Sequence, residues 1–375
     1  MPNIKRGMMG AAGASSGGPE LFTWGSNQYG QLGLGDTTSR SSPTQIGALK
    51  TWANITFGNS NAFAVQTDGT LWVWGWGQSG VLGDGTSVSK SSPVQVGSLT
   101  NWVSVNGKNA AGGVKTDGTL WMWGLGSTGA IGDGTSVSKS SPVQVGALTT
   151  WASNTSTTQG STHAVTTDGK LFSWGYGAYG ALGTGTGANY SSPIQVGALT
   201  NWAEAHGAYY ASIARKTDGT VWGWGYGAYN LLGTGVATVN SPVQIGSATN
   251  WATVSATHMT GLGVQTDGTL WGWGRNGYGE IGDGTTSTRA EPVQVGSLTN
   301  WAAVAQCGGP GQGHSIARKT DGTLWGWGRN DAGQIGDGTT VGKSSPVQIG
   351  SLTTWSDTTP GRSMYTQASA GILEP

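Results

Sequence analysis

A nine-residue phrase recurs along almost the whole chain, and this recurrence restricts the possible folds more than any other feature. Each complete copy begins Thr-Asp-Gly and ends Trp-Gly, as in residues 266–274. The six complete copies contain Asp68, Asp117, Asp168, Asp218, Asp267 and Asp321. A seventh Trp-Gly, at Trp24, has no Thr-Asp-Gly before it. The chain is therefore a repeat protein with one atypical unit.

The spacing of two tryptophan series predicts the architecture. The Trp of Trp-Gly falls at Trp24, Trp74, Trp123, Trp174, Trp224, Trp273 and Trp327. A second series has the same spacing and falls at Trp52, Trp102, Trp151, Trp202, Trp251, Trp301 and Trp355. A period of about 50 residues with several short strands is typical of propeller blades and not of a helical solenoid. Seven periods predict seven blades.

One period can be divided into four strands, at residues 251–254, 261–265, 269–274 and 290–295. Asp267-Gly268 between two apolar runs predicts a two-residue type I′ hairpin turn, which needs positive φ at both positions. Pro292, which has no backbone donor, fits an outer edge strand. Helix patterns are lacking throughout the sequence. We therefore expect an all-β, seven-bladed β-propeller of four-stranded antiparallel blades.

The third strand of each period is apolar on both faces. Trp271 and Trp273 point to one side, and Leu270 and Gly272 point to the other. A strand with two apolar faces must be covered on both, so we expect the blades to stack face to face. The small residue at Gly272 is expected to let the tryptophan layer of the next blade approach closely.

The two ends of the chain complement each other. Trp355 starts a period that never reaches Trp-Gly, and the strands that it lacks resemble residues 21–46. Residues 364–367 resemble residues 64–67 of the second strand in an earlier period. We therefore expect a composite N-/C-terminal blade, which would leave no open edge in the ring.

Composition narrows the possible partners. The 18 basic and 18 acidic residues balance, whereas nucleic-acid binding requires a basic stripe, so we expect no nucleic-acid partner. No apolar run is long enough to cross a bilayer, so we expect no membrane insertion.

Cys307 is the only cysteine and excludes an intrachain disulfide. We expect residues 21–375 to form a single domain.

The loop after Trp-Gly carries a family resemblance. Residues 24–33 read Trp-Gly-Ser-Asn-Gln-Tyr-Gly-Gln-Leu-Gly, residues 327–336 nearly repeat them, and residues 314–317 read His-Ser-Ile-Ala. This pattern resembles the regulator of chromosome condensation repeat family, and the resemblance implies a seven-bladed propeller. That family includes a nucleotide exchange factor, a plant ultraviolet photoreceptor and secreted enzyme inhibitors, so the resemblance does not fix the function. The chain lacks a match to the acidic insertion of the exchange factor and to the Trp-Arg cluster of the photoreceptor.

No catalytic, metal or cofactor site can be assigned. His163, His206, His258 and His314 lie at different distances from their Asp-Gly turns and form no repeated site. The Gly-Asp-Gly-Thr connectors, such as the one at Asp84, offer one carboxylate each, which is too few for a calcium loop. We interpret them as turns in which the aspartate bonds its own backbone. The chain is therefore expected not to be an enzyme.

The side chains that differ between blades are the best candidates for binding. Aromatic and arginine residues on loops of a rigid scaffold are the usual material of a protein or glycan contact surface. The alternative is that the aromatic residues only cap their blades. The candidates are Trp76, Tyr176, Tyr179, Tyr226, Tyr229, Arg275, Tyr278 and Arg329.

Residues 1–20 match no repeat and are rich in Gly, Ala and Ser, which is typical of a flexible attachment tail. We expect Ile4, Lys5, Arg6, Met8 and Met9 to dock it. Residues 1–13 resemble the glycine-rich starts of structural proteins of marine tailed phages. That resemblance implies a virion protein, a tail appendage or surface decoration that binds other virion proteins through the tail. A host-surface protein or glycan would be its outer contact.

A second hypothesis is a secreted or envelope-associated bacterial module that binds a protein or a glycan. Lys5-Arg6, the short stretch after them and Ala12-Gly13-Ala14 could form a small signal peptide. The mature N-terminus separates the two hypotheses, because cleavage after Ala14 is expected only for the secreted form. The virion would retain Met1 or Pro2.

Overall fold

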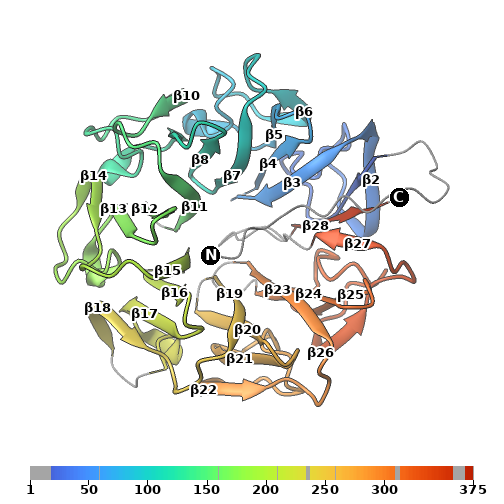
Figure 1. The fold of residues 1–375 in the computed structure, drawn as a ribbon. Helices are drawn as coiled ribbons and strands as arrows, with labels where there is room; N and C mark the ends of the chain where they lie inside the picture. The colour runs from blue at the N-terminus through green and yellow to red at the C-terminus, as the bar shows by residue number, and fades with distance from the viewer. Residues whose placement is uncertain are drawn as a thin grey trace, which may run out of the picture.

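Seven antiparallel sheets of four strands each stand around a ring in the computed structural model (Figure 1). The structure describes residues 18–58, 60–158, 160–208, 210–233, 237–257, 259–308, 313–357 and 368–374. Blades 1 to 6 follow one another along the chain, and the seventh, the composite blade, joins the two ends. The predicted architecture is confirmed.

Blades 1 to 3 have these strands, from the innermost to the outermost: β3 (Trp52–Phe57), β4 (Asn61–Gln66), β5 (Leu71–Gly75) and β6 (Lys90–Gln95); β7 (Trp102–Gly107), β8 (Ala110–Lys115), β9 (Leu120–Gly124) and β10 (Lys139–Gln144); β11 (Trp151–Thr158), β12 (Ser161–Thr166), β13 (Leu171–Gly175) and β14 (Tyr190–Gln195). Blades 4 to 6 have β15 (Trp202–Gly207), β16 (Ala211–Lys216), β17 (Val221–Tyr226) and β18 (Thr238–Gln244); β19 (Trp251–Thr257), β20 (Thr260–Gln265), β21 (Leu270–Gly274) and β22 (Arg289–Gln294); β23 (Trp301–Cys307), β24 (His314–Lys319), β25 (Leu324–Gly328) and β26 (Lys343–Gln348).

The composite blade closes the ring as expected. Its strands run in the order β27 (Trp355–Asp357), β28 (Ala368–Leu373), β1 (Glu20–Gly25) and β2 (Arg40–Lys50). In the pairing of β1 with β28, Leu21 lies opposite Ile372 and Trp24 opposite Ser369. The second strand of this blade follows the segment 364–367 that the sequence comparison matched to residues 64–67. The strand is β28, whose small residues repeat the Ala-Gly character of β8, and residues 364–367 lie outside the described part of the chain.

The hairpin turns between second and third strands differ from the predicted type. In blade 1 the N–H of Gln66 donates to the carbonyl of Thr70, so the loop has three residues, Thr67, Asp68 and Gly69. Among these, only Gly69 has positive φ, at 81°. This is a type I turn followed by a left-handed glycine, the other common hairpin solution. The carboxylate of Asp68 accepts the N–H and hydroxyl of Thr70, which fixes the turn.

Seven indole N–H groups fasten each blade to the preceding one. Trp327 Nε1 in blade 6 donates to the carbonyl of Glu280 in blade 5 at 2.8 Å. Trp24 Nε1 in the composite blade donates to the carbonyl of Gln334 in blade 6 at 3.1 Å. The other donor and acceptor pairs are Trp74 and Gln31, Trp123 and Val81, Trp174 and Ala130, Trp224 and Ala181, and Trp273 and Leu231. These tryptophans are fully buried, so the bonds are shielded from water.

The apolar faces stack as predicted, with one correction. Trp271 and Trp273 pack in one core cluster and Leu270 packs in the next. Gly272, however, makes room for Ile281 and Leu262 of its own blade, since a Cβ there would lie 2.8 Å from each. The glycine that admits the tryptophan of the next blade is Gly282, where a Cβ would lie 2.7 Å from Trp327 Nε1.

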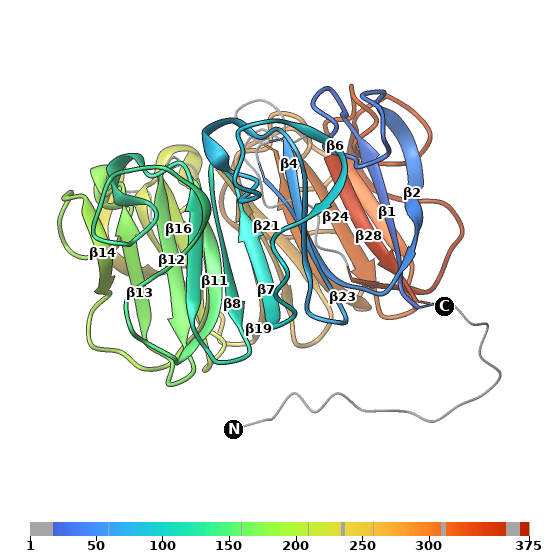
Figure 2. The same cartoon turned by 90° about the horizontal axis from the view of Figure 1, so that it is seen from above.

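The ring has two different faces, seen edge-on in Figure 2. The turn face carries the hairpins between second and third strands and the connectors between blades. The loop face carries the loops from first to second strands and from third to fourth strands. In blades 1 to 4 the latter contain single 3-10 turns, which the sequence analysis did not predict: η1 (Gln78–Gly80), η2 (Ser127–Gly129), η3 (Ala178–Gly180) and η4 (Ala228–Asn230). The described residues include no helix with the length and apolar character that crossing a bilayer requires.

Candidate binding surface

In blades 3 to 5 the loop after the third strand exposes one tyrosine on the loop face. In blades 3 and 4 this residue has positive φ, 58° at Tyr179 and 56° at Tyr229, inside the 3-10 turn. Tyr179 is 50% exposed and Tyr229 is 53% exposed, and Tyr278 in blade 5 is 41% exposed. The equivalent residues of blades 1 and 2 are Ser79 and Thr128. The same positive-φ position of the 3-10 turn therefore carries an aromatic ring in blades 3 and 4 and a small polar side chain in blades 1 and 2.

Four tyrosines meet across the junction of blades 3 and 4. The ring of Tyr210 lies 5.6 Å from that of Tyr176 and 5.3 Å from that of Tyr179, measured between centroids. Tyr179 also lies 5.2 Å from Tyr226. These distances are within the range of favourable aromatic pairs. Contacts between neighbouring blades thus hold the rings in a continuous cluster.

A second cluster contains two arginines and lies on blades 4 to 6. The guanidinium of Arg275 lies 5.9 Å from the ring centre of Tyr229 and 5.6 Å from that of Tyr278. Arg329 lies 5.2 Å from Tyr278. Such contacts are cation–π interactions, which also fix the orientation of the planar guanidinium. The two clusters are joined by residues 226–229 of blade 4, which carry Tyr226 of the first and Tyr229 of the second. We call both together the aromatic–arginine strip; its members are Tyr176, Tyr179, Tyr210, Tyr226, Tyr229, Arg275, Tyr278 and Arg329.

The two arginines of the strip differ in their partners. Arg329 Nε donates to Asp331 Oδ1 at 2.8 Å, and a second ion-pair contact joins Nη2 to Oδ2. The hydrogen bond with Asp331 raises the pKa of Arg329 above its ordinary value. The guanidinium of Arg275 makes no ion pair or hydrogen bond within the described ranges, although its charge acts on the buried Glu280. Its charge is therefore available, whereas that of Arg329 is already compensated.

Below the strip lies a buried acidic residue. Glu280 is 1% exposed, and its Oε2 accepts the N–H of Tyr278 at 2.7 Å. Burial raises the pKa of this carboxyl above its ordinary value, although the N–H of Tyr278 and the charge of Arg275 oppose the shift. Gln31 and Gln334 make the same backbone bond in their blades, to Tyr29 and Ala332. The side chain at this position thus holds the loop in shape.

The structure brings together seven of the eight candidates from the sequence. Trp76 stays apart, because it is half-buried against the core between blades 1 and 2. Two contributors were not predicted, Tyr210 and Asp331. Tyr210 lies in the loop from first to second strand, and nothing in the sequence signals that this loop touches Tyr179 of the preceding blade. The tail candidates Ile4, Lys5, Arg6, Met8 and Met9 lie outside the described residues.

The described histidines are structural. His163 is buried with Nε2 2.7 Å from the hydroxyl of Ser212, and burial lowers its pKa to about 3. His314 is buried with Nε2 2.9 Å from the hydroxyl of Ser369. His206 lies 3.4 Å from Glu204. His258 is outside the described ranges, within which no cluster of three potential metal-ligating side chains occurs.

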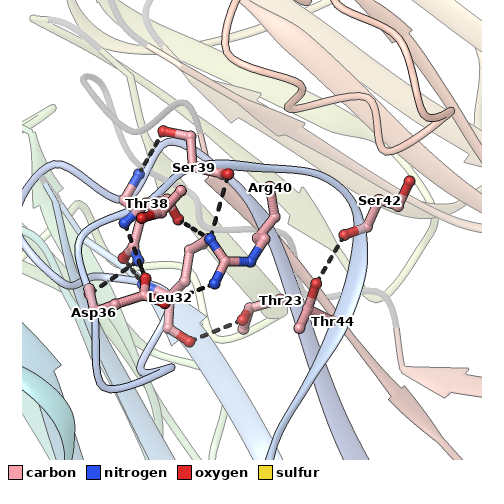
Figure 3. A network of polar contacts seen from close by, with 9 residues as sticks. Thr23, Leu32, Asp36, Thr38, Ser39, Arg40, Ser42 and Thr44 are labelled. Atoms are coloured by element: carbon pink, nitrogen blue, oxygen red, sulfur yellow. Dashed lines mark hydrogen bonds and ion pairs between the residues drawn. The ribbon is translucent and has the colours of Figure 1, made fainter.

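The Gly-Asp-Gly-Thr connectors are self-bonded turns, as interpreted from the sequence. Asp84 Oδ1 accepts both the N–H and the hydroxyl of Thr86. Figure 3 shows the related turn of the composite blade, where Asp36 accepts the N–H of Thr38 at 2.9 Å and pairs with Arg40 at 2.6 Å. The hydrogen bond from Thr38 is the main cause of a lowered pKa at Asp36. These carboxylates are occupied by their own turns.

Comparison with known proteins identifies the repeat. The model of the regulator of chromosome condensation (RCC1) repeat matches residues 20–65, 68–107, 117–165, 168–214, 267–317 and 321–371. No curated protein sequence matches the chain.

Solved structures share the fold. Human WBSCR16 is 18% identical, with a TM-score of 0.82 over 95% of this chain and 99% of that one. Prp20p from Saccharomyces cerevisiae, in a structure that also concerns its binding to Gsp1p and histones, is 18% identical, with a TM-score of 0.79 over 96% and 93%. Yeast RCC1 (Prp20) bound to Kap60 is 17% identical, with a TM-score of 0.80 over 100% and 97%. At this identity the likeness extends to the fold alone.

Proposed function

Because the chain belongs to the regulator of chromosome condensation repeat family, we propose that it is a protein-binding propeller without catalytic activity. Its contact surface is the aromatic–arginine strip. The observation that carries this proposal is that the strip spans blades 3 to 6, with three tyrosines about half exposed and each cluster held by contacts between neighbouring blades. Tyrosine and arginine supply most of the affinity in protein interfaces, and rings fixed before binding lose little entropy. The protein partners named for Prp20p support the same class of function.

We further propose that the protein belongs to the virion of a bacterial virus and docks on other virion proteins through residues 1–20. The path of the described chain supports this arrangement. The carbonyl of Pro19 accepts the N–H of Thr51, which places the beginning of the described chain at the turn face. The strip lies on the opposite, loop face. A tail that docks at the turn face leaves the strip directed outward, toward a protein or glycan of the host surface.

Mass spectrometry of purified virus particles tests the virion role. Peptides of this chain are expected in the particles, with an N-terminus at Met1 or Pro2. An N-terminus created by cleavage after Ala14, together with recovery of the protein only from cell-free medium, would replace the virion with the secreted binding module.

Adsorption of particles to host cells tests the strip. A Tyr179→Ala/Tyr229→Ala double variant is expected to reduce adsorption by about tenfold or more, because interface tyrosines often contribute about 2 kcal/mol each. Ser79→Ala/Thr128→Ala is the matched control, since it changes the same turn positions in blades outside the strip. Equal adsorption by both double variants would show that the strip is not the contact surface.

A further inference from the structure

Most charges of the loop face are buried or paired within the protein. Five aspartates of the loops after the third strands, Asp36, Asp84, Asp133, Asp283 and Asp337, are each paired with the arginine or lysine that begins the fourth strand. The other charged residues in the described loops of this face are Lys108, Arg275, Glu280, Arg329 and Asp331. Lys108 is 2% exposed and Glu280 is 1% exposed, so neither offers its charge to a partner. Arg329 and Asp331 neutralise each other. Among the described residues of these loops, Arg275 is left as the partly exposed charge without an ion-pair partner.

Arg275 is also held in place before any partner binds. Its guanidinium lies 5.9 Å from the ring centre of Tyr229 and 5.6 Å from that of Tyr278, so it contacts two aromatic rings. An arginine that contacts two aromatic rings has a restricted orientation, and its planar fork of donors suits a planar carboxylate. A lysine could not replace it, because an ammonium group lacks the planar fork.

The flanking residues suggest the shape of the ligand. Tyr229 contacts Arg275 of the next blade, and three residues before it in the chain Tyr226 packs on Tyr179 of the preceding blade. The aromatic side chains therefore extend along the loop face over two blade boundaries. Exposed aromatic surfaces of this kind bind extended segments, above all polyproline-type ones whose conformation is fixed in advance. On the proposed binding function, we infer that the strip recognises an extended acidic protein segment. One carboxylate of that segment pairs with Arg275, and its apolar or proline residues pack on the tyrosines.

Fluorescence anisotropy with the full-length protein tests the inference. The probes are a labelled peptide of repeated Glu-Pro and its neutral twin of repeated Gln-Pro. The Glu-Pro peptide is expected to bind at least about tenfold more tightly, because a charge-assisted hydrogen bond contributes more than about 1.4 kcal/mol. Arg275→Ala is expected to remove this preference, and Arg275→Lys to reduce it.

Two variants in blade 6 serve as matched tests. Arg329→Ala should change the affinity for Glu-Pro by less than about twofold, since Asp331 already compensates that charge. Asp331→Asn should increase the affinity severalfold, because it releases Arg329 as a second cation beside Tyr278. Thermal melting by circular dichroism confirms that each variant is folded.

Equal binding of the Glu-Pro and Gln-Pro peptides, or an unchanged preference in Arg275→Ala, would overturn the inference. So would binding of a neutral maltooligosaccharide in place of the Glu-Pro peptide. These failures are separate from failure of the proposed function. If the tyrosine double variant loses adsorption while no peptide binds, only the acidic preference is wrong. If the peptides bind through Arg275 while adsorption is unchanged, the host-contact role is wrong.

Discussion

The contribution of the composite blade to stability can be tested by comparing Trp24→Phe, at the junction that closes the ring, with the equivalent Trp327→Phe between blades 5 and 6. Both indole rings are fully buried, and both donate to a carbonyl of the preceding blade. Each acceptor carbonyl keeps a second bond in the variant, from Ser369 to Gln334 at 2.9 Å and from Ser315 to Glu280 at 2.7 Å. Neither substitution therefore leaves an unsatisfied carbonyl, and the two sites are chemically equivalent.

The expected loss can be worked out from these contacts. The missing hydrogen bond contributes about 1 kcal/mol. The smaller ring buries on the order of 50 Å² less, which is about 1 kcal/mol at ~25 cal/mol/Å². A small cavity adds up to about 1 kcal/mol. Each substitution should thus lower the free energy of unfolding by about 2–3 kcal/mol, and the two values should agree within ~0.5 kcal/mol.

Urea unfolding followed by far-ultraviolet circular dichroism measures both variants without relying on tryptophan emission. The m value, which is the slope of the free energy of unfolding against urea concentration, should equal that of the parent protein, because the surface exposed on unfolding is nearly unchanged. If Trp24→Phe costs less than ~1 kcal/mol while Trp327→Phe costs the full amount, the composite blade does not hold the ring closed, and the reasoning fails.

Three further predictions concern single features of the fold. Glu280→Gln should raise the melting temperature at pH 7, because burial raises the pKa of the Glu280 carboxyl in the folded protein. The stabilisation by the protonated carboxyl is present below the ordinary pKa of 4.5 and is lost as the pH rises through the folded value, so the melting temperatures of the two proteins should converge in acid. A difference in melting temperature that is independent of pH would contradict this cause. Gly282→Ala should destabilise the protein by at least about 2 kcal/mol more than Gly296→Ala in urea unfolding. Both glycines have positive φ, but a Cβ at Gly282 would clash with Trp327, whereas a Cβ at Gly296 would have no atom within 4 Å. Similar free energies of unfolding for the two variants would show that the backbone conformation alone determines the cost. Deletion of residues 355–375 should abolish cooperative thermal unfolding, because β1 and β2 would remain as an isolated hairpin; a melt like that of the full chain would refute the role of the composite blade.

The repeat made the fold predictable from the sequence. Two tryptophan series with one spacing indicated the number of blades, and the alternation of Trp271 and Trp273 with Leu270 indicated two buried faces. The type of the hairpin turn between second and third strands could not be predicted in the same way. Asp-Gly is compatible with both a two-residue and a three-residue hairpin, and the bond from Gln66 to Thr70, which decides between them, depends on the register of the two strands.

The candidate site was predictable residue by residue but not as a surface. Exposed aromatic and arginine residues after Trp-Gly were visible in the sequence, and seven of them lie in the strip. The contact of Tyr179 with Tyr210 and the pairing of Arg329 with Asp331 depend on loop conformations. Periodicity places equivalent residues at equivalent positions, but it does not tell which side chains of neighbouring blades touch.

The indole bonds between blades end on main-chain carbonyls, and this choice of acceptor has an evolutionary consequence. A carbonyl is present whatever the side chain, and the acceptor residues here range from alanine to glutamate: Gln31, Val81, Ala130, Ala181, Leu231, Glu280 and Gln334. Mutations at these positions can therefore accumulate without opening the circle. A blade duplicated or exchanged by recombination would find the same acceptor in any new neighbour, so surface specificity can change one module at a time.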